Sequence, residues 1–458
     1  MSESLSHIAN EFVKKVKEFI KEQEKSEEKW DINRVEEFLR PVITELGREI
    51  INELVKRKAE EAEKQVVKCK CEKMPSKQRQ EKITFYTTYG EVTVETGYYY
   101  CNRCGHGDNP FRRLTGVRGK WRSRMLERAL VDFGSEESFE KAHMRLEEHY
   151  GISIGASTIR AVTEEHGRQA MEFIDSKLEE AMKKYEGSSC RYGGIERLIV
   201  ECDGSDVRTG ELREMTEEEI ENIQEEGLPL TQKSSSKIRR KRETKWREVR
   251  LISTLKQGEV EAKYLATMED CESVGKKMFG LALLHGMGEK TFVHGLGDGA
   301  PWIADQFKTN FPNGRFLLDR YHLIENIYKG AEGLGTTNEK IKKRWVNTQV
   351  ERIDKGLIDR VLKECEKKAG GNKDSPMNGL IRYIKERMEY LDYQKAQEDG
   401  LPVGSGVVES GHKHVVQKRL KLPGTWWKEE NVNPMLALRV IRANYWWEDY
   451  WKNINVTN

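Results

Sequence analysis

The sequence of 458 residues contains no apolar run near the roughly 20 residues that a membrane-spanning helix needs. Its first residues, MSESLSHIANEF, lack the apolar stretch of a secretory signal. We therefore expect a cytoplasmic protein without a membrane partner. The net charge is only +2, so the total charge indicates no particular partner.

The charges are unevenly distributed. Residues 211–226 carry eight acidic residues and one arginine, whereas residues 237–250 carry eight basic and two acidic residues. Such blocks are either solvated surface or, for the basic one, a contact to phosphates through residues such as Arg239 and Arg240. The charged segment 207–245 looks like an insertion between two strands, and the sequence assigns it no role.

Eight cysteines are present, and four of them form two close pairs. Apolar alternation in Ile83–Tyr89 and Glu91–Tyr100, broken at Tyr89-Gly90, predicts a β-hairpin between the pairs. Four thiolates at the base of a hairpin resemble a zinc ribbon with a structural Zn²⁺ ion. One pair is a residue tighter than usual, so unligated reduced thiols remain the alternative, and the scattered cysteines are expected to be buried. The paired cysteines are Cys69, Cys71, Cys101 and Cys104.

A cluster of helices is expected after the hairpin. We predict one helix over Trp121–Phe133, a second capped by Ser135 and ending at Gly151, and a third capped by Ser157. Two short helices around a glycine-containing turn are typical of a helix-turn-helix that binds DNA, although an ordinary helical hairpin has the same pattern. The candidate DNA contacts in the third helix are Ser157, Thr158 and Arg160.

From residue 194 the pattern changes to strands. Strands are expected at Arg197–Cys202, Trp246–Leu255, Glu259–Thr267, Lys290–Gly297 and Arg315–Leu318, with helices before the last two. The order β-β-β-α-β-α-β is that of an RNase H-like domain, in which the first and fourth strands are neighbours. Residues 321–400 are expected to be helical, and a last helix runs from Val407 to Leu420.

Three carboxylates are expected to converge in this domain. Asp203 and Asp298 each follow a strand and precede a glycine, and Glu409 opens the last helix. Carboxylates without cationic partners repel one another unless divalent ions neutralise them, and oxygen ligands favour Mg²⁺ or Mn²⁺. Two such ions support in-line phosphoryl transfer. Each acid alone is also an ordinary turn residue.

Three stretches carry a resemblance to a known family: VECDGSD, GLGDGAPWIADQFKTNFPNGRFLLDRYHL and GLPVGSGVVESGHKHVVQKRLKLPGTWWKEENVNPMLALR. They resemble DDE transposases of insertion sequences, especially the Kra type (ISKra) and its Lre relatives (ISLre). The resemblance implies that Asp203, Asp298 and Glu409 are catalytic and that residues 323–400 are an all-helical insertion. It also implies that Asp319 and His322 form a supporting (Cys/Asp)-x-x-His signature, with Asp319 as the rival second acid.

Further basic and aromatic residues are candidate nucleic-acid contacts. Glu409, Lys413 and Val416 are expected to share one helix face, so Lys413 would meet a phosphate beside the metals. Lys418, Arg419 and Lys421 extend this DNA track or form a solvated face. Trp345 is a candidate for base stacking, whereas the tail residues are expected to pack in the core. The tail residues are Trp426, Trp427, Tyr445, Trp446, Trp447, Tyr450 and Trp451.

The sequence therefore predicts a multidomain α/β (α+β) protein. Its expected parts are a helical segment (1–65), a zinc-ribbon-like hairpin (66–112), a helix-turn-helix domain (119–190), the first part of an RNase H-like core (194–322), the helical insertion (323–400), and the rest of the core with the aromatic tail (401–458). The expected function is metal-dependent strand cleavage and transfer at insertion-sequence ends, acting as a homo-oligomer on double-stranded DNA. The alternatives are a non-catalytic DNA-binding protein and an RNase H-like nuclease that does not join strands.

Overall fold

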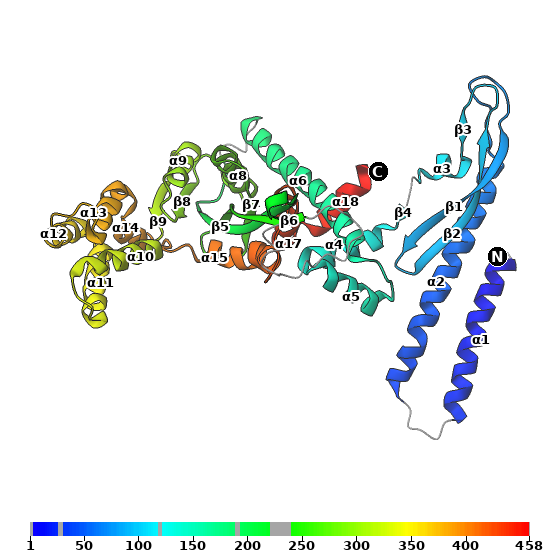
Figure 1. Ribbon diagram of the computed structural model, residues 1–458, viewed down its shortest axis with the longest axis horizontal. Coiled ribbons are helices and arrows are strands. Elements are labelled where there is room, and N and C mark those ends of the chain that lie inside the picture. Colours follow the sequence, from blue (N-terminus) through cyan, green and yellow to red (C-terminus); the bar gives the residue numbers. More distant parts are fainter. Residues whose placement is uncertain (1–2, 26–30, 118–120, 188–192, 220–239, 458) are drawn as a thin grey trace. The chain divides into compact units, whose positions relative to one another are not determined.

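The computed structural model describes residues 3–25, 31–117, 121–187, 193–219 and 240–457. The chain divides into two compact units, residues 1–162 and 163–458. Each has its own sheet (Figure 1), so the protein combines helices with two mixed sheets. No helix in the described ranges is both long and apolar enough to cross a membrane.

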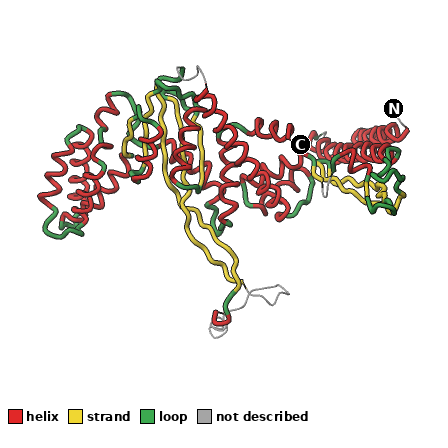
Figure 2. The backbone as a smooth tube through the Cα atoms, turned by 90° about the horizontal axis from the view of Figure 1, so that it is seen from above, coloured by secondary structure: helices red, strands yellow, loops and turns green. Residues whose placement is uncertain are grey.

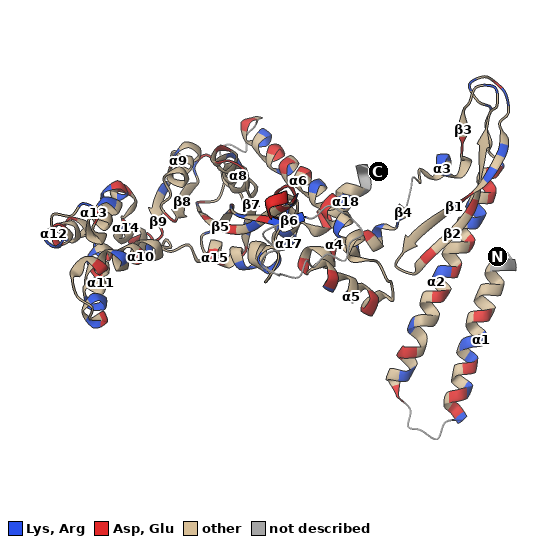
Figure 3. Ribbon diagram, in the orientation of Figure 1, with Lys and Arg blue, Asp and Glu red and all other residues tan. Residues whose placement is uncertain are grey.

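The first unit joins a helical hairpin to a four-stranded sheet of order β3-β2-β1-β4. Side chains of α2 pack with the sheet in one apolar cluster that includes Ala62, Ile83 and Val94. Lys and Arg alternate with Asp and Glu along α1 and α2 (Figure 3), as on solvated helix faces. The elements are α1 (Glu3–Lys25), α2 (Ile32–Glu63), β1 (Ser76–Thr87), β2 (Gly90–Tyr100), β3 (Gly107–Asp108), α3 (Pro110–Thr115), β4 (Trp121–Arg122), α4 (Arg124–Glu136) and α5 (Phe139–Tyr150).

The hairpin prediction is confirmed, and two helix starts are corrected. Thr87 pairs with Gly90, which leaves a two-residue turn between β1 and β2. Trp121 pairs with Phe85 in the short strand β4, so the following helix begins only after Ser123, which caps it. Ser138 rather than Ser135 caps α5, because α4 continues through Ser135 to Glu136.

Helix α6 (Ala156–Gly187) begins in the first unit and continues in the second. Ser157 lies inside its first turn and is not its cap, which corrects the expected start. The helix has 32 residues, so it is far longer than the recognition helix that the sequence predicted. Ser157, Thr158 and Arg160 are exposed on that first turn.

The second unit is built on a five-stranded sheet of order β7-β6-β5-β8-β9. The first and fourth strands of this unit, β5 and β8, are neighbours and run parallel, as the sequence predicted. Strand β6 is antiparallel to both β5 and β7, and β9 is parallel to β8. The strands are β5 (Arg197–Glu214), β6 (Arg240–Lys256), β7 (Ala262–Thr267), β8 (Phe292–Gly297) and β9 (Arg315–Leu318).

Strand β5 does not end before Asp203. It continues to Glu214 and pairs with β6 along its whole length, from Leu198 with Lys256 to Glu214 with Arg240. The described parts of segment 207–245 therefore extend two strands into a ribbon that projects from the sheet (Figure 2). Arg239 lies outside the described residues.

Helices cover the sheet and extend beyond β9 (Figure 1). Residues 321–400, which the sequence predicted to be helical, do form a series of helices. The apolar core between these helices includes Leu323, Val361 and Ile384. The helices are α8 (Cys271–Leu284), α9 (Pro301–Asn310), α10 (Arg320–Ala331), α11 (Glu339–Asp354), α12 (Ile358–Lys368), α13 (Pro376–Glu386), α14 (Tyr393–Glu398), α15 (Gly406–Gly411), α16 (Lys418–Leu420), α17 (Val432–Ala443) and α18 (Trp447–Thr457). Short 3₁₀ helices lie at Glu332–Leu334, Met388–Tyr390 and Glu429–Asn431.

The last predicted helix contains a wide turn. Residues His412–Gln417 form a π-helix between α15 and α16. The extra residue per turn changes which side chains share a face. Val416 is fully buried while Glu409 and Lys413 are exposed, so the expectation that the three share one face is wrong.

Candidate active site and metal centre

Asp203 and Asp298 lie at the same level of two neighbouring strands. The parallel ladder between β5 and β8 ends at the pair Cys202 and Gly297. The two aspartates are the next residues, and their carboxylates both raise the pKa of the Cys202 thiol, although its burial is the main cause. The sheet therefore brings together two acids that are 95 positions apart in the sequence.

A buried glutamate that the sequence reading missed joins β5 to α15. The Glu201 carboxylate is 2% exposed and accepts hydrogen bonds from the Val408 amide at 2.6 Å and from the Ser253 hydroxyl at 3.4 Å. The first turn of α15 is thereby held against the strand that carries Asp203. A charged residue inside the apolar run RLIVEC was the signal that could have identified it.

His412 is a second missed residue at this edge. Its imidazole is buried, and its Nε2 atom lies 3.2 Å from Asp203 Oδ2. Gly411 allows this approach, because a Cβ atom there would lie only 2.6 Å from the Tyr264 ring. The buried imidazole of His412 therefore lies beside the Asp203 carboxylate on the helix side.

Glu409 follows the anchored residue Val408 and is exposed. It lies near enough to Tyr321 to help raise the pKa of that phenol, after the larger effect of Glu325. Among the described residues, the cysteine cluster below is a group that could hold a metal ion, and the three acids do not form a second such group. The sheet and α15 place the acids on adjacent elements.

Asp319, the rival second acid, has a structural position. It is 1% exposed and accepts hydrogen bonds from the Tyr321 and Ser405 amides, both at 2.6 Å, and from the Ser405 hydroxyl. By contrast, Asp298 is partly exposed and accepts one bond, from the Ala300 amide at 2.8 Å. Asp319 ties the end of β9 to the loop before α15, and Asp298 has the freer carboxylate.

We expect Asp319→Ala to lower the free energy of unfolding by about 2–5 kcal/mol, because buried donors lose their acceptor. The matched variant Asp298→Ala loses one part-buried turn bond and should cost about 1 kcal/mol. Urea unfolding of both variants, followed by circular dichroism, measures the difference. Equal losses of stability would contradict the assignment of Asp319 as the structural acid.

Burial of Glu201 also predicts a pH dependence. Desolvation raises its pKa to about 7 from a usual 4.5. A carboxyl group with a raised folded pKa stabilises the fold at low pH, and this contribution is lost as the pH rises from about 4.5 through 7. The expected loss is on the order of 3 kcal/mol. Urea unfolding between pH 5 and 8 should therefore give a smaller decline for Glu201→Gln than for the unmutated protein, and parallel curves would refute this.

The basic residues after Glu409 do not form one continuous track. Lys413 and Lys418 are exposed, but Arg419 is 2% exposed and lies over the Trp427 ring at 4.7 Å. Burial lowers the pKa of Arg419 to about 10. Arg419 is thus a packing residue, which corrects the expectation that it contacts DNA from the surface.

Lys421 lies beside the part of β5 that carries Asp203. Its amino group donates a hydrogen bond to the Ser205 hydroxyl. Desolvation lowers its pKa, while the carboxylates of Asp206 and Asp203 act in the opposite direction. Lys421 therefore supplies a positive charge beside the acidic edge of the sheet.

The remaining predicted residues have local contacts. His322 Nδ1 lies 3.6 Å from Glu325 Oε2 on the same helix. Trp345 packs against the helical core, so packing explains it without base stacking. Most tail aromatics are buried as predicted, but Tyr445 is 79% exposed and Trp426 is half-buried. Among the scattered cysteines, Cys202 and Cys365 are buried as expected, Cys271 is half-buried, and Cys190 lies outside the described residues.

The four paired cysteines form a cluster in the first unit. The sulfur of Cys69 lies 2.8 Å from that of Cys71 and 3.3 Å from that of Cys101, and Cys71 lies 3.6 Å from Cys101. The ligand atoms of these three and Cys104 all lie within 4.8 Å of one another. Four thiolates at these separations can hold a metal ion such as zinc.

Local turns explain how the short first pair reaches the cluster. Glu72 has a left-handed backbone (φ 63°), and its amide bonds to the Cys69 carbonyl at 2.8 Å. This tight turn directs Cys69 and Cys71 to one point despite their close spacing. In the second pair, the backbone amide of Cys104 is the main cause that lowers the pKa of Cys101 to about 6, which favours the thiolate.

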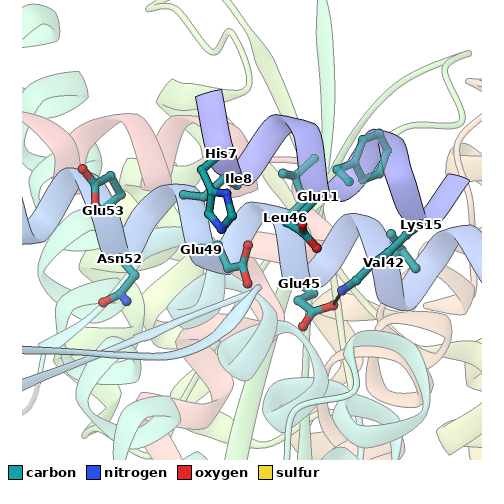
Figure 4. A pocket seen from close by; sticks show the side chains of 11 residues that line it. His7, Ile8, Glu11, Lys15, Val42, Glu45, Leu46, Glu49, Asn52 and Glu53 are labelled. Atoms are coloured by element: carbon teal, nitrogen blue, oxygen red, sulfur yellow. Dashed lines mark hydrogen bonds and ion pairs between the residues drawn. The ribbon is translucent and has the colours of Figure 1, made fainter. Parts of the chain in front are cut away.

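A hollow between α1 and α2 is a further concave feature of the first unit (Figure 4). Its lining includes Glu11, Glu45, Glu49 and Glu53, and Lys15 donates to Glu45 at 2.6 Å. The pair raises the pKa of Lys15 and lowers that of Glu45. With its principal charge pair exposed on two solvated helices, the hollow has no feature of an active site.

Comparison with known proteins concerns the C-terminal part of the chain. Residues 288–451 match the family described as "Uncharacterised protein family (UPF0236)". This part of the chain is similar to UPF0236. The matched segment contains Asp298, Asp319 and Glu409, and Asp203 lies before it.

Two UPF0236 proteins of Caldanaerobacter subterraneus subsp. tengcongensis are each 30% identical to the chain over 157 residues, which is 34% of this chain. The aligned region covers 31% and 30% of the two relatives, so the chain spans about a third of their length. The name of one relative joins four locus designations and that of the other joins two.

Proposed function

We propose that the protein is a DDE transposase that cleaves DNA at the ends of an insertion sequence and joins the ends to target DNA. One observation carries the proposal. Asp203 and Asp298 are the residues directly after the last pair of the parallel β5–β8 ladder, and the Glu201–Val408 bond holds the helix with Glu409 beside β5. This is the juxtaposition expected of an RNase H-like catalytic core.

The order of the strands supports the same proposal. The sheet order β7-β6-β5-β8-β9 places the first and fourth strands of the unit side by side. Helices α10 to α14 lie in the sequence between Asp298 and Glu409. In the proposal, these helices are the insertion that precedes the catalytic glutamate.

The donor groups match a divalent cation with a preference for oxygen. Asp203, Asp298 and Glu409 would hold Mg²⁺ or Mn²⁺, and two ions, when bound, supply charge stabilisation for phosphoryl transfer. His412 lies beside Asp203, and Lys421 provides a cation for a phosphate near the same edge. His322 and Asp319 support the site through α10 and the loop before α15.

In this proposal the first unit recognises DNA. The four-cysteine hairpin holds zinc, and α5 with the start of α6 is the helix-turn-helix, whose Ser157, Thr158 and Arg160 are exposed. Lys413 and Lys418 are exposed near the acidic edge and would contact phosphates, with Arg240 on the ribbon. Double-stranded DNA would be bound by a homo-oligomer.

Strand transfer of a pre-cut element end, with Mg²⁺ or Mn²⁺, tests this function. The end sequence is to be taken from inverted repeats, searched for by sequencing the DNA that flanks the gene. Covalent joining of the 3′-hydroxyl end to target DNA is the expected result. Cleavage without joining would identify a nuclease, and DNA binding without divalent-dependent cleavage would identify a non-catalytic binding protein.

A further inference from the structure

The ribbon of β5 and β6 has two different faces. Directly paired residues of an antiparallel ladder point to the same side, and successive residues alternate. One side, called here the paired face, includes Arg213 and Lys241, which are ladder partners. The other side, called the open face, includes the ladder pairs Arg208–Trp246, Gly210–Thr244 and Leu212–Arg242, and it continues to Glu214–Arg240 at the outer end and to Asp206–Glu248 nearer the sheet.

Carboxylates already neutralise the cations of the paired face. Arg213 lies 2.7 Å from Glu219 and 2.8 Å from Glu243, and Lys241 lies 2.9 Å from Glu219. Nearer the sheet, Lys245 and Arg247 lie 2.7 Å and 2.5 Å from Glu429. The four cations of this face therefore have little charge to offer to a partner.

In the described part of the chain, Arg208 and Arg242 form no ion pair with the acids of the open face, Asp206, Glu248 and Glu214. Arg208 donates to the Thr244 hydroxyl at 3.3 and 3.2 Å, and Arg242 lies 5.3 Å over the ring of Trp426. Neither contact neutralises a guanidinium group. Their remaining N–H donors are available for phosphate oxygens.

Aromatic rings lie among these arginines. Trp246, the ladder partner of Arg208, is 65% exposed, and Leu212, the partner of Arg242, is 53% exposed. Thr209 and Trp427 are bridge partners on the paired side, so the preceding Trp426 points to the open face. The open face thus combines two indole rings with two arginines whose charges are not neutralised.

We propose that the open face binds an unpaired strand of DNA, with phosphates on Arg208 and Arg242 and a base stacked on Trp246. This rests on the proposed function only in taking DNA as the partner. Positive charge with exposed aromatic rings is the pattern by which proteins hold single strands, because every base offers a ring face. A second copy of this chain would meet like charge on its own open face, so charge favours DNA.

The experiment measures binding of a labelled single-stranded oligonucleotide and of a hairpin duplex of the same sequence. Fluorescence anisotropy is recorded at several salt concentrations without divalent ions. Trp246→Ala should weaken single-strand binding by about five- to hundredfold and leave the salt dependence unchanged. The double variant Arg208→Gln/Arg242→Gln should reduce the slope of log K against log salt by about 1.4.

The matched control is Lys241→Gln/Lys245→Gln, which removes two charges from the paired face of the same ribbon. It should keep both the affinity and the slope. Single-strand affinity within twofold for Trp246→Ala overturns the proposal, as does an equal loss for duplex and single strand. A variant that dissociates an oligomer while keeping DNA affinity would instead identify a contact between copies and would also overturn it.

This test is independent of catalysis. If the protein performs strand transfer and its Trp246→Ala variant binds single strands normally, the transposase proposal stands and the proposal of single-strand binding by the open face fails. If the open face binds single strands but the protein performs no strand transfer, the binding proposal stands and the transposase proposal fails.

Discussion

Asp203→Asn is expected to reduce both strand cleavage and strand transfer by orders of magnitude. The substitution keeps the size of the side chain and removes a charge that the ions of the proposed site require. Binding of the element end should change little, because it depends on phosphate contacts and on the first unit. The measurement is strand transfer of a pre-cut end, with end binding measured in parallel.

Asp305→Asn is the matched control for this prediction. Asp305 is exposed on α9 of the same unit, so its replacement removes an equal charge away from the acidic edge. It should retain both activities. Joined product at an unchanged rate in Asp203→Asn would exclude this aspartate from the site.

Cys101→Ser is expected to remove the bound metal and to unfold the hairpin of the first unit. Cys101 is 1% exposed and its sulfur contacts those of Cys69 and Cys71, so no other residue can replace it. Structural zinc contributes about 10–16 kcal/mol to the folding of small zinc domains at neutral pH. Even a fraction of that value would lower the melting temperature of the first unit substantially.

Metal analysis and thermal unfolding of the purified protein measure this effect. The unmutated protein should contain one zinc ion per chain, and a chelator should reproduce the effect of Cys101→Ser. Cys271→Ser, a replacement of a half-buried cysteine outside the cluster, should keep the zinc. If the unmutated protein contains no metal and melts at the same temperature as Cys101→Ser, the four cysteines are unligated reduced thiols.

Regular patterns in the sequence predicted much of the fold. Alternation predicted the hairpin, since one face of β1 and β2 packs against α2 and the other is solvated. Short apolar runs predicted the five strands of the second sheet, because β5 and β8 are buried on both faces. The pairing of β5 with β8 then followed from the strand order.

The ribbon could not be predicted in the same way. Outside the sheet, residues such as Glu211, Leu212 and Glu243 are all exposed, so no apolar alternation marks the strands. Pairing with β6 holds them in place. Charged composition alone therefore suggested an insertion of unknown structure.

Site residues next to a recognisable turn could be predicted from the sequence, whereas those whose role depends on tertiary packing could not. Asp203 and Asp298 were visible from Asp-Gly after apolar runs, although β5 continues past the first of them. The roles of Glu201 and His412 depend on α15 lying against β5, which no local pattern encodes. The burial of Arg419 depends in the same way on its contact with Trp427.

The π turn at His412–Gln417 separates two rotational settings within one helix. Each residue of an α-helix rotates the chain by about 100°, so one additional residue turns everything after it by that angle relative to what precedes it. The front segment is held by Glu201 and carries Glu409, while Arg439 donates to the His414 carbonyl inside the wide turn. Substitutions that rotate the segment after the wide turn, which carries Lys418, can therefore change the geometry of that turn without rotating Glu409.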